Sequence, residues 1–382
     1  MTTNGLRLLN RKVSVNALRT VIPCSALVAC SAVTGADSVH VELDGRLERS
    51  AVVILSASYR GQRVADSEIS WSASPSEAVS FLSDQRAEFL QAGPITISAN
   101  TGTASGERSI DVAVPPTIVF DMLDSGNRDI YRAALDAKDM VRLTSHLGDD
   151  SDPTVAGDVV VFVSFRDGNG ELYAMSLTGG TPERLTSTDV PEASPALSSD
   201  GAMLAYSRTD AGVPKLWVGA SDGSNAARVS DSFGFAGSIE ASPSWAPDGE
   251  QLAFMSTSEG TADLYTHSVS DGSFSQLVPD SAFRAEVEPA WSPDGKWVAF
   301  ASDRAGDTEI YLVEVATGKL TRLTSRSGTD GQPAWTADGR LVYTAWVAGE
   351  SSLRWLDPVS PATVHDIDIG AGEPGHPTAV QN

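Results

Sequence analysis

The sequence is poor in cysteine, histidine and basic residues, and each shortage excludes a class of function. Its two cysteines, Cys24 and Cys30, lie within the first 30 residues, so the rest of the chain can form neither a disulfide framework nor a cysteine-based zinc site. The five histidines are scattered and include no His-x-His or His-Glu-x-x-His pair that would build a metal site. With 27 Lys and Arg against 50 Asp and Glu, the formal net charge of -23 repels phosphate backbones and excludes nucleic acid as a partner.

The acidity itself leaves two interpretations open, because a negative surface can maintain solubility or attract a basic protein patch or a cation. Hydrophobic residues make up 41% of the chain, a globular composition, and 33 Gly and 20 Pro spread along it predict many short turns in place of long helices. A length of 382 residues permits a small domain followed by one large all-β domain. Disorder and a helical bundle are both disfavoured.

The N-terminus reads as a leader, with a basic stretch followed by the apolar run Val21–Ala29, which is too short to span a bilayer. Residues 27–30 (Leu-Val-Ala-Cys) resemble the bacterial lipobox, in which the Cys thiol is acylated and becomes the mature N-terminus. This resemblance implies a signal peptide over residues 1–30, lipidation at Cys30, and membrane contact through the lipid anchor only. Ser31 after the Cys implies sorting to the outer membrane, hence a periplasmic or cell-surface location. A cleaved, unlipidated signal peptide and a mis-assigned start codon are the alternatives.

Residues 36–115 alternate between apolar and polar positions and predict a small β-sandwich, because six or seven short strands in about 80 residues are typical of that fold. The predicted strands are Ser38–Leu43, Ala51–Tyr59, Glu68–Ala73, Ala78–Leu82, Pro94–Ala99 and Arg108–Val114. The segment Ile69–Ser74, followed by Ala92–Ala99 and Val112–Val114, resembles bacterial Ig-like domains. Trp71 is expected to be a core side chain of the sandwich.

The remaining chain is organised by a repeat of 42 to 48 residues, marked by a proline at each of six positions. These are Pro153, Pro195, Pro243, Pro289, Pro333 and Pro377. A small residue and then a larger apolar one follow each proline in most repeats, so that large and small side chains alternate between the two faces of a strand. An Asp-Gly hairpin signal, an apolar second strand, a third strand with an aromatic and a fourth with Arg-Leu-Thr-Ser or a looser version follow. Four strands per repeat predict one propeller blade.

The ends of the repeat region predict how the ring closes. Residues 117–145 supply the second, third and fourth strands of a blade without a first strand, and Pro377–Asn382 supplies a first strand alone. Pairing the last strand with the first blade removes the exposed edges of an open array. The predicted fold class is therefore all-β, with a six-bladed β-propeller over residues 116–382 preceded by the small Ig-like β-sandwich.

The segment Glu286–Tyr311 (EVEPAWSPDGKWVAFASDRAGDTEIY) closely resembles the WD40-like repeats of the TolB family, and the similarity extends along the whole predicted propeller. This resemblance implies a periplasmic six-bladed propeller that docks an envelope protein, the peptidoglycan-associated lipoprotein, at one propeller face. Upstream, the predicted sandwich replaces the α/β domain with which that family engages inner-membrane partners. The resemblance thus implies a TolB-like envelope propeller and not a true Tol role.

One set of acidic residues recurs with the repeat, three positions before the proline. Its members are Asp150, Glu192, Glu240, Glu286 and Asp330, with Pro374 breaking the series. Each lies where the chain enters the innermost strand, so ring closure is expected to arrange them around one channel mouth as a partner-binding ring for a basic segment or a cation. The alternative is structural, with each carboxylate accepting hydrogen bonds from backbone amides of its own or the next blade.

Catalytic and cofactor motifs appear only out of context. Gly219–Gly223 fits the nucleophile-elbow pattern without a following helix, and Gly370–Gly375 fits the dinucleotide pattern only seven residues before residue 382. Asp303–Glu309 lacks the ligand ladder of a calcium loop. We therefore predict no catalytic residues, no cofactor and no metal, and a non-catalytic envelope platform for protein–protein interaction. The alternatives are a propeller lyase or hydrolase-associated enzyme acting on an envelope or extracellular polymer, and a purely structural surface lipoprotein.

Overall fold

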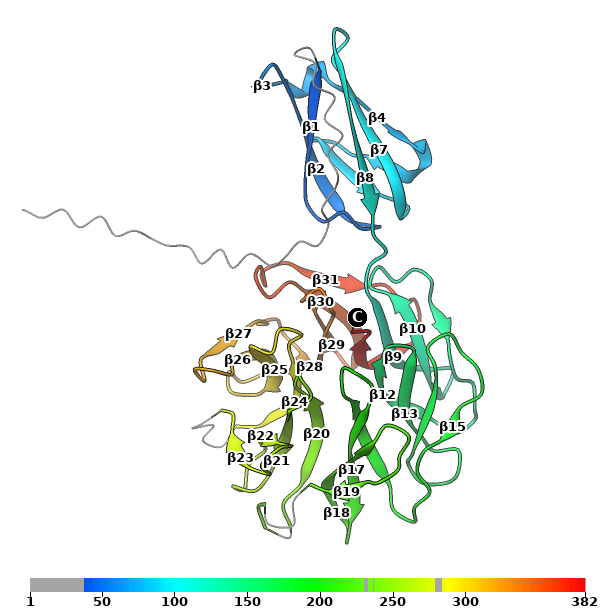
Figure 1. The fold of residues 1–382 in the computed structure, drawn as a ribbon, viewed down its shortest axis with the longest axis vertical. Helices are drawn as coiled ribbons and strands as arrows, with labels where there is room; N and C mark the ends of the chain where they lie inside the picture. The colour runs from blue at the N-terminus through cyan, green and yellow to red at the C-terminus, as the bar shows by residue number, and fades with distance from the viewer. Residues whose placement is uncertain (1–37, 230–232, 236, 279–283, 382) are drawn as a thin grey trace, which may run out of the picture. The chain divides into compact units, whose positions relative to one another are not determined.

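A computed structural model describes residues 38–229, 233–235, 237–278 and 284–381, which fold as β-strands with two short 3-10 turns (Figure 1). The chain divides into two compact units between Ala113 and Val114, close to the predicted boundary between residues 115 and 116. The predicted signal peptide and its Cys30 lie outside the described residues. Within the described residues, no helix is long and apolar enough to cross a membrane.

The N-terminal unit consists of two antiparallel sheets. The first contains β1 (Val39–Asp44), β2 (Val52–Tyr59), β3 (Gln62–Arg63), β5 (Val79–Phe81) and β6 (Arg86–Phe89), and the second contains β4 (Ser70–Ser74), β7 (Gly93–Asn100) and β8 (Ser105–Val112). Two short 3-10 turns, η1 (Asp66–Glu68) and η2 (Ser76–Ala78), flank β4. Alternate residues of these strands are buried and form one core. We call this unit the sandwich; its assignment to the Ig-like family stays a prediction.

The prediction for the sandwich missed β3 and β6. β3 has two residues, and β6 has the sequence Arg-Ala-Glu-Phe, in which only Ala87 and Phe89 face the core. Four residues are too few for alternation to stand out from a loop. Trp71 on β4 packs against the core as expected, but its side chain is only partly buried.

The second unit contains six four-stranded antiparallel sheets, which are the blades of a propeller (Figure 1). Blade 1 contains β32 (Glu373–Ala379), β9 (Thr117–Asp124), β10 (Asn127–Ala134) and β11 (Val141–Arg142); blade 2 contains β12 (Asp150–Ala156), β13 (Val159–Ser164), β14 (Glu171–Ser176) and β15 (Glu183–Arg184). Blade 3 contains β16 (Glu192–Leu197), β17 (Met203–Asp210), β18 (Val213–Ala220) and β19 (Ala227–Arg228); blade 4 contains β20 (Glu240–Trp245), β21 (Gln251–Ser256), β22 (Asp263–Ser268) and β23 (Phe274–Gln276). Blade 5 contains β24 (Glu286–Trp291), β25 (Trp297–Ser302), β26 (Glu309–Glu314) and β27 (Leu320–Arg322); blade 6 contains β28 (Thr329–Trp335), β29 (Leu341–Val347), β30 (Glu350–Leu356) and β31 (Val364–Ile367). The predicted all-β, six-bladed fold is confirmed.

Two pairs of neighbouring blades interlock through the tryptophan two positions after the repeat proline. The indole Nε1 of Trp245 donates to the carbonyl of Ala196 in the preceding blade at 3.0 Å, and Trp335 donates to Ala290 in the same way at 3.0 Å. The small residue after the proline thus leaves a shallow face that the next blade's tryptophan covers. This contact agrees with the predicted alternation of large and small side chains.

The ring closes by pairing β32 with β9. The register runs from Glu373 opposite Leu123 to Ala379 opposite Ile118, so the innermost strand of blade 1 comes from the C-terminal end of the described chain. β32 therefore occupies the position that β12, β16, β20, β24 and β28 occupy in the other blades. The predicted closure by a C-terminal strand is confirmed, and it leaves blade 1 without an open inner edge.

Candidate functional site

A central cavity runs along the six innermost strands, and the repeat prolines line it from every blade. Beyond the prolines, one end of about 210 Å³ is lined by polar side chains, one from each blade. They are Asp152, Ser194, Ser242, Glu288, Gln332 and His376, and we call this end the polar mouth. The other part, of about 560 Å³, is lined by tryptophans and by the turns after the first strands, and we call its opening the opposite mouth.

The polar mouth is built by a β-bulge repeated in every blade. The pairing of the first and second strands shifts register at the proline, for example between Ser151 and Thr154 in blade 2. At that point the residue before each proline adopts a left-handed backbone, with φ between 44° and 55° at all six positions. This conformation normally favours glycine, and none of the six residues is glycine. The fold therefore retains a polar side chain at each of these positions although the backbone there is strained.

A chain of hydrogen bonds links the mouth residues across four blades. Glu288 of blade 5 accepts from the backbone N–H of Gln332 in blade 6 at 2.6 Å, and the Gln332 side-chain oxygen accepts from the N–H of His376 in blade 1 at 2.8 Å. A Cβ atom at Gly331 would lie 3.0 Å from Glu288 Oε2, so the glycine gives the carboxylate room to reach blade 6. The mouth is thereby preorganised before any ligand arrives.

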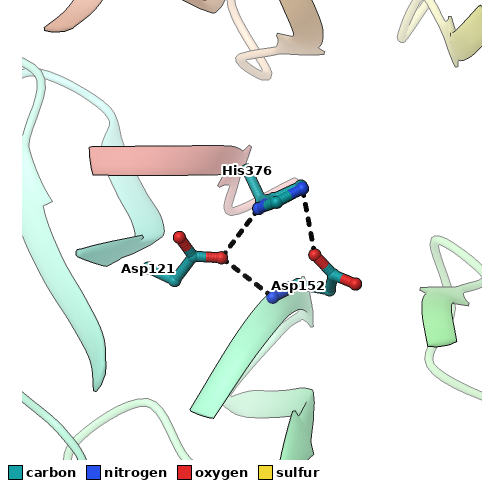
Figure 2. Close-up of side chains that lie close together, drawn as sticks. All are labelled: Asp121, Asp152 and His376. Carbon is teal, nitrogen blue, oxygen red and sulfur yellow. Dashed lines mark hydrogen bonds and ion pairs between the residues drawn. The ribbon is translucent and has the colours of Figure 1, made fainter. Parts of the chain in front are cut away.

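His376 stands at the centre of this network, between Asp121 on β9 and Asp152 on β12 (Figure 2). Its Nδ1 lies 2.8 Å from Asp121, and its Nε2 lies 3.0 Å from Asp152. Asp121 is fully buried and also pairs with Arg128, whereas the His376 side chain is 41% exposed. Asp121 accepts from the backbone N–H of Asp152 as well, at 3.0 Å. Blades 1 and 2 are thus joined at the mouth by one buried carboxylate.

The charges around His376 keep its imidazole protonated at neutral pH. Burial by itself lowers the pKa, but the hydrogen bond to Asp121 and the charges of Asp152 and Asp121 outweigh that effect and raise the pKa of His376 to about 9. Because both ring nitrogens donate to carboxylates, the ring cannot act as a general base near pH 7. The imidazolium also supplies the positive charge between Asp121 and Asp152 that a bound cation would otherwise supply. The geometry therefore favours binding over acid–base chemistry.

Two carboxylates of the mouth, those of Asp152 and Glu288, have raised pKa values. Burial raises the pKa of Asp152, with His376 opposing the shift, and burial likewise raises the pKa of Glu288 above its usual range. A raised pKa means that the charged form is disfavoured where it stands, so a positive group that enters the mouth would stabilise it. The polar mouth is therefore suited to bind a cationic group through its carboxylate, amide and hydroxyl groups.

The five acidic residues that the sequence placed at the mouth lie elsewhere, and this part of the prediction is wrong. Asp150, Glu192, Glu240, Glu286 and Asp330 are at most 5% exposed. In a regular strand they would share a face with the residues two positions later, but the bulge lies between the two positions and separates their directions. The mouth is therefore lined by the residue before each proline and not by the residue three positions before it.

Three of the buried carboxylates pair with an arginine or lysine side chain of their own blade or of the preceding one. Asp150 accepts from Arg166 at 3.1 Å, Glu286 pairs with Arg304, and Glu240 pairs with Lys215 of the preceding blade at 3.0 Å. Backbone amides donate as well, from Leu216 to Glu240 at 3.4 Å and from Leu264 to Glu286. The structural alternative considered for these acids is thus closer to what is seen, with side chains in place of most of the expected backbone donors.

Glu192 and Asp330 lie instead beside other carboxylates. Glu192 accepts from the hydroxyls of Thr186 and Thr188, and burial together with the charge of Glu171 raises its pKa to about 7. Burial, with Glu309 nearby, raises the pKa of Asp330 to about 6. Burial also raises the pKa of Glu286 to about 7, although Arg304 opposes that shift. The pKa values of these three buried carboxylates are thus raised to near neutral pH.

The residues of the polar mouth share a sequence feature that could have identified them. The residue directly before the repeat proline is polar in all six repeats, although its type changes from blade to blade. A position that stays polar beside an invariant proline within one chain indicates a common surface. Asp121 had no such signal, because it lies on the second strand of blade 1 and joins the site only through ring closure.

These features define a class of protein, a closed six-bladed propeller with a preorganised polar mouth on its axis. The sequence pattern of the TolB beta propeller domain matches residues 115–236 and 191–357, more than half of the chain. The chain therefore belongs to the TolB beta propeller domain family, and the predicted resemblance is confirmed. No curated protein matches the sequence.

Solved structures show the same fold at low sequence identity. TolB from Acinetobacter baumannii is 16% identical, with a TM-score of 0.64 over 76% of this chain and 80% of that chain. A putative TolB from Agrobacterium tumefaciens is 19% identical, with a TM-score of 0.55 over 66% of this chain and 88% of that chain. A chain of a nidogen/laminin complex is 13% identical, with a TM-score of 0.55 over 69% and 98% of the two chains. At these identities the similarity establishes the fold alone.

Proposed function

We propose that this propeller is a non-catalytic docking platform of the bacterial cell envelope, and that its polar mouth binds a positively charged group of a protein partner. The observation that carries the proposal is the ring of six non-glycine polar residues held in left-handed conformations around one opening. Glycine would relieve the backbone strain at each position, so the side chains themselves are what the fold retains.

The chemistry of the mouth selects the ligand group. Burial disfavours the charged forms of Asp152 and Glu288. The positive charge of a lysine, an arginine or an N-terminal ammonium that enters between them would stabilise both carboxylates and be stabilised by them. The partner is an envelope protein, with a peptidoglycan-associated lipoprotein as the first candidate because the family resemblance implies one. Lipidation at Cys30 would hold the protein at the periplasmic side or the cell surface of the outer membrane.

An enzymatic role is the second candidate, and the same residues argue against it at this site. Asp121, Asp152 and His376 offer one nitrogen and two carboxylate oxygens within 4.8 Å of one another, a set that could serve hydrolysis. His376, however, is protonated near pH 7 and holds both carboxylates through its N–H groups. A binding role uses this arrangement as it stands, whereas catalysis would first have to dismantle it.

Site-specific photocrosslinking in native cells tests the proposal. A photoreactive residue at Ser242 in the polar mouth should crosslink to one protein partner, and the same residue at Ser199 in the opposite mouth should not. The double variant Asp152→Asn, Glu288→Gln should abolish the Ser242 crosslink and keep the fold. As a charge-matched control, Asp248→Asn with Glu250→Gln changes two exposed acids at the other end of blade 4 and should leave the crosslink intact.

The proposal also predicts a salt dependence, since exposed charges are screened over roughly 10 Å at 0.1 M ionic strength. Crosslinking at Ser242 should weaken between low and high salt in the wild type. Crosslinks that form only at Ser199, or that survive the Asp152→Asn, Glu288→Gln change, would overturn the mouth as the binding site.

A further inference from the structure

The sandwich carries two cavities, and residues of the segment Arg63–Glu68 line both of them. The first, of about 300 Å³, lies between the edge strands β4 and β5, and we call it the Trp71 cavity. The second, of about 500 Å³, lies where β2, β3 and the β7–β8 turn meet, and we call it the Tyr59 cavity. Volumes of this order are those of small-ligand pockets.

The Trp71 cavity combines an aromatic wall with polar groups of both signs. Trp71 is only partly buried, and Phe81 and Leu82 beside it are 38% and 39% exposed, high values for residues of this size. Asp66, Asp84 and Arg86 complete the lining with two carboxylates and one guanidinium. Such a wall suits a ligand that has an apolar face and edges that both donate and accept hydrogen bonds.

The turn that supplies Asp84 and Gln85 is not built for stability alone. Both residues adopt left-handed conformations, with φ of 59° and 57°, where Asn-Gly or Asp-Gly is the favoured pair. The Gln85 side-chain oxygen accepts from Arg63 at 3.2 Å, which directs the amide NH₂ group away from Arg63. That Nε2 is buried and has no hydrogen-bond partner within the described part of the chain, and Gln85 lines the Trp71 cavity, so a ligand acceptor that reaches this nitrogen would supply the missing hydrogen bond.

The Tyr59 cavity repeats the same chemistry. Tyr59 provides an aromatic ring, one face of which the Arg60 guanidinium covers at 5.1 Å from the ring centroid. Arg63 and Glu68 provide opposite charges, and Thr101 and Thr103 provide hydroxyls. Arg63 lines this cavity while it donates to Gln85 of the first one, so a single hydrogen bond connects the two. Two aromatic surfaces with mixed polar rims therefore lie next to each other on one domain.

We propose that the sandwich binds a neutral oligosaccharide, with one sugar ring against Trp71 and a second at Tyr59. A sugar ring presents C–H groups on its faces and hydroxyl or acetamido groups around its edge, which matches the aromatic walls and the donors and acceptors of both cavities. The two linings contain three carboxylates, of Asp66, Glu68 and Asp84, and two guanidinium groups, of Arg63 and Arg86, so they carry no excess of positive charge that would select an anionic glycan. This inference concerns the sandwich alone and does not depend on the proposed role of the polar mouth.

The test uses the full chain labelled with 5-fluorotryptophan and followed by ¹⁹F NMR. Trp71 is the only tryptophan outside the propeller, so a Trp71→Phe sample assigns its resonance. Titration with the trimer of N-acetylglucosamine and with cellotriose should shift the Trp71 resonance and no other tryptophan resonance. We expect a Kd of about 1 mM. Trigalacturonate, the acidic counterpart, should bind at least several-fold more weakly.

Two variants separate binding from folding. Gln85→Gly removes the amide and fits the left-handed backbone, so it should weaken sugar binding about fivefold while the melting temperature stays equal or rises. Tyr59→Ala should weaken the trimers and leave single sugars unchanged. The matched control Ala137→Gly makes the same backbone change at another left-handed residue, in the propeller, and should leave binding unaltered.

Each outcome decides the matter. A Trp71 shift with a sugar that is lost on Gln85→Gly supports the proposal. No shift at 10 mM of either neutral trimer, or a shift that Gln85→Gly leaves unchanged, overturns it. A shift with a phenylalanine-containing tripeptide and none with the sugars also overturns it and identifies the Trp71 cavity as a peptide site.

Discussion

Lys215 on β18 lies 3.0 Å from Glu240 on β20, and both side chains are only 2% exposed. In four other blades the position of Lys215, two residues before the aromatic of the third strand, is acidic: Asp129, Glu171, Asp263 and Glu309. One blade boundary thus contains an ion pair where at least two others, Glu171 with Glu192 and Glu309 with Asp330, bring two carboxylates together. Residues at one repeat position therefore respond oppositely to the same substitution.

Glu240→Gln should destabilise the propeller strongly, because it leaves the Lys215 ammonium buried without its carboxylate. Removing one partner of a buried pair costs about 3–5 kcal/mol, although Lys215 keeps its bond to the Ser238 carbonyl at 2.6 Å. The double variant Lys215→Met, Glu240→Gln should recover most of the loss. Urea unfolding of the three proteins measures this, and a loss below about 1 kcal/mol for Glu240→Gln would contradict it.

Glu192→Gln should have the opposite sign above neutral pH. Since burial and Glu171 raise the pKa of Glu192 from 4.5 to about 7, its contribution to stability is complete below pH 4.5 and is lost as the pH rises through about 7. Gln imitates the protonated acid at every pH. We expect nearly equal melting temperatures at pH 4 and a more stable variant at pH 8, by about 1–3 kcal/mol. Equal pH profiles of variant and wild type would refute the assignment.

His376→Gln should remove a second pH dependence, at higher pH. Because the folded protein raises the pKa of His376 from 6.5 to about 9, the stabilisation is complete below pH 6.5 and disappears as the pH rises through about 9. The wild type should therefore be more stable than the variant below pH 6.5, and this difference in melting temperature should shrink as the pH rises from 6.5 to 9. His40→Gln, on the exposed side of β1, is the control.

Cys30→Ala should convert a membrane-bound protein into a soluble one. The predicted lipobox makes Cys30 the acylated N-terminus of the mature chain, and the thiol is the atom that carries the lipid. Detergent partitioning followed by mass spectrometry of the N-terminus measures this. An intact leader, or an unmodified N-terminus in the wild type, would argue for one of the other interpretations of the first 30 residues.

The propeller fold could be predicted because the same strand pattern recurs along the chain around six repeat prolines. The proline recurs in all six repeats, 42 to 48 residues apart, and the Asp-Gly turn and the aromatic of the third strand recur in most of them, so an error in one blade is corrected by the others. The closure by β32 also followed from counting strands. In the sandwich, which has no repeat, two short strands were missed.

The site was misplaced by one structural detail that spacing cannot reveal. Strict alternation gives Asp150 and Asp152 the same direction, and only the bulge between Ser151 and Thr154 separates them. A one-residue irregularity leaves no signature in hydrophobicity, and here its left-handed residue is not glycine. The contact of Asp121 with His376 joins residues 255 positions apart, and no local pattern encodes such a pairing.

Pairing of β32 with β9 makes synthesis of Glu373–Ala379 a condition for a closed ring. During synthesis the inner edge of β9 has no partner until Glu373–Ala379 emerges, after all the other blades have been made. A chain that stalls or is cut before that segment exposes a strand edge, the kind of surface that chaperones and proteases recognise. Copies without this segment should therefore be degraded in the cell, and only chains that contain Glu373–Ala379 should accumulate.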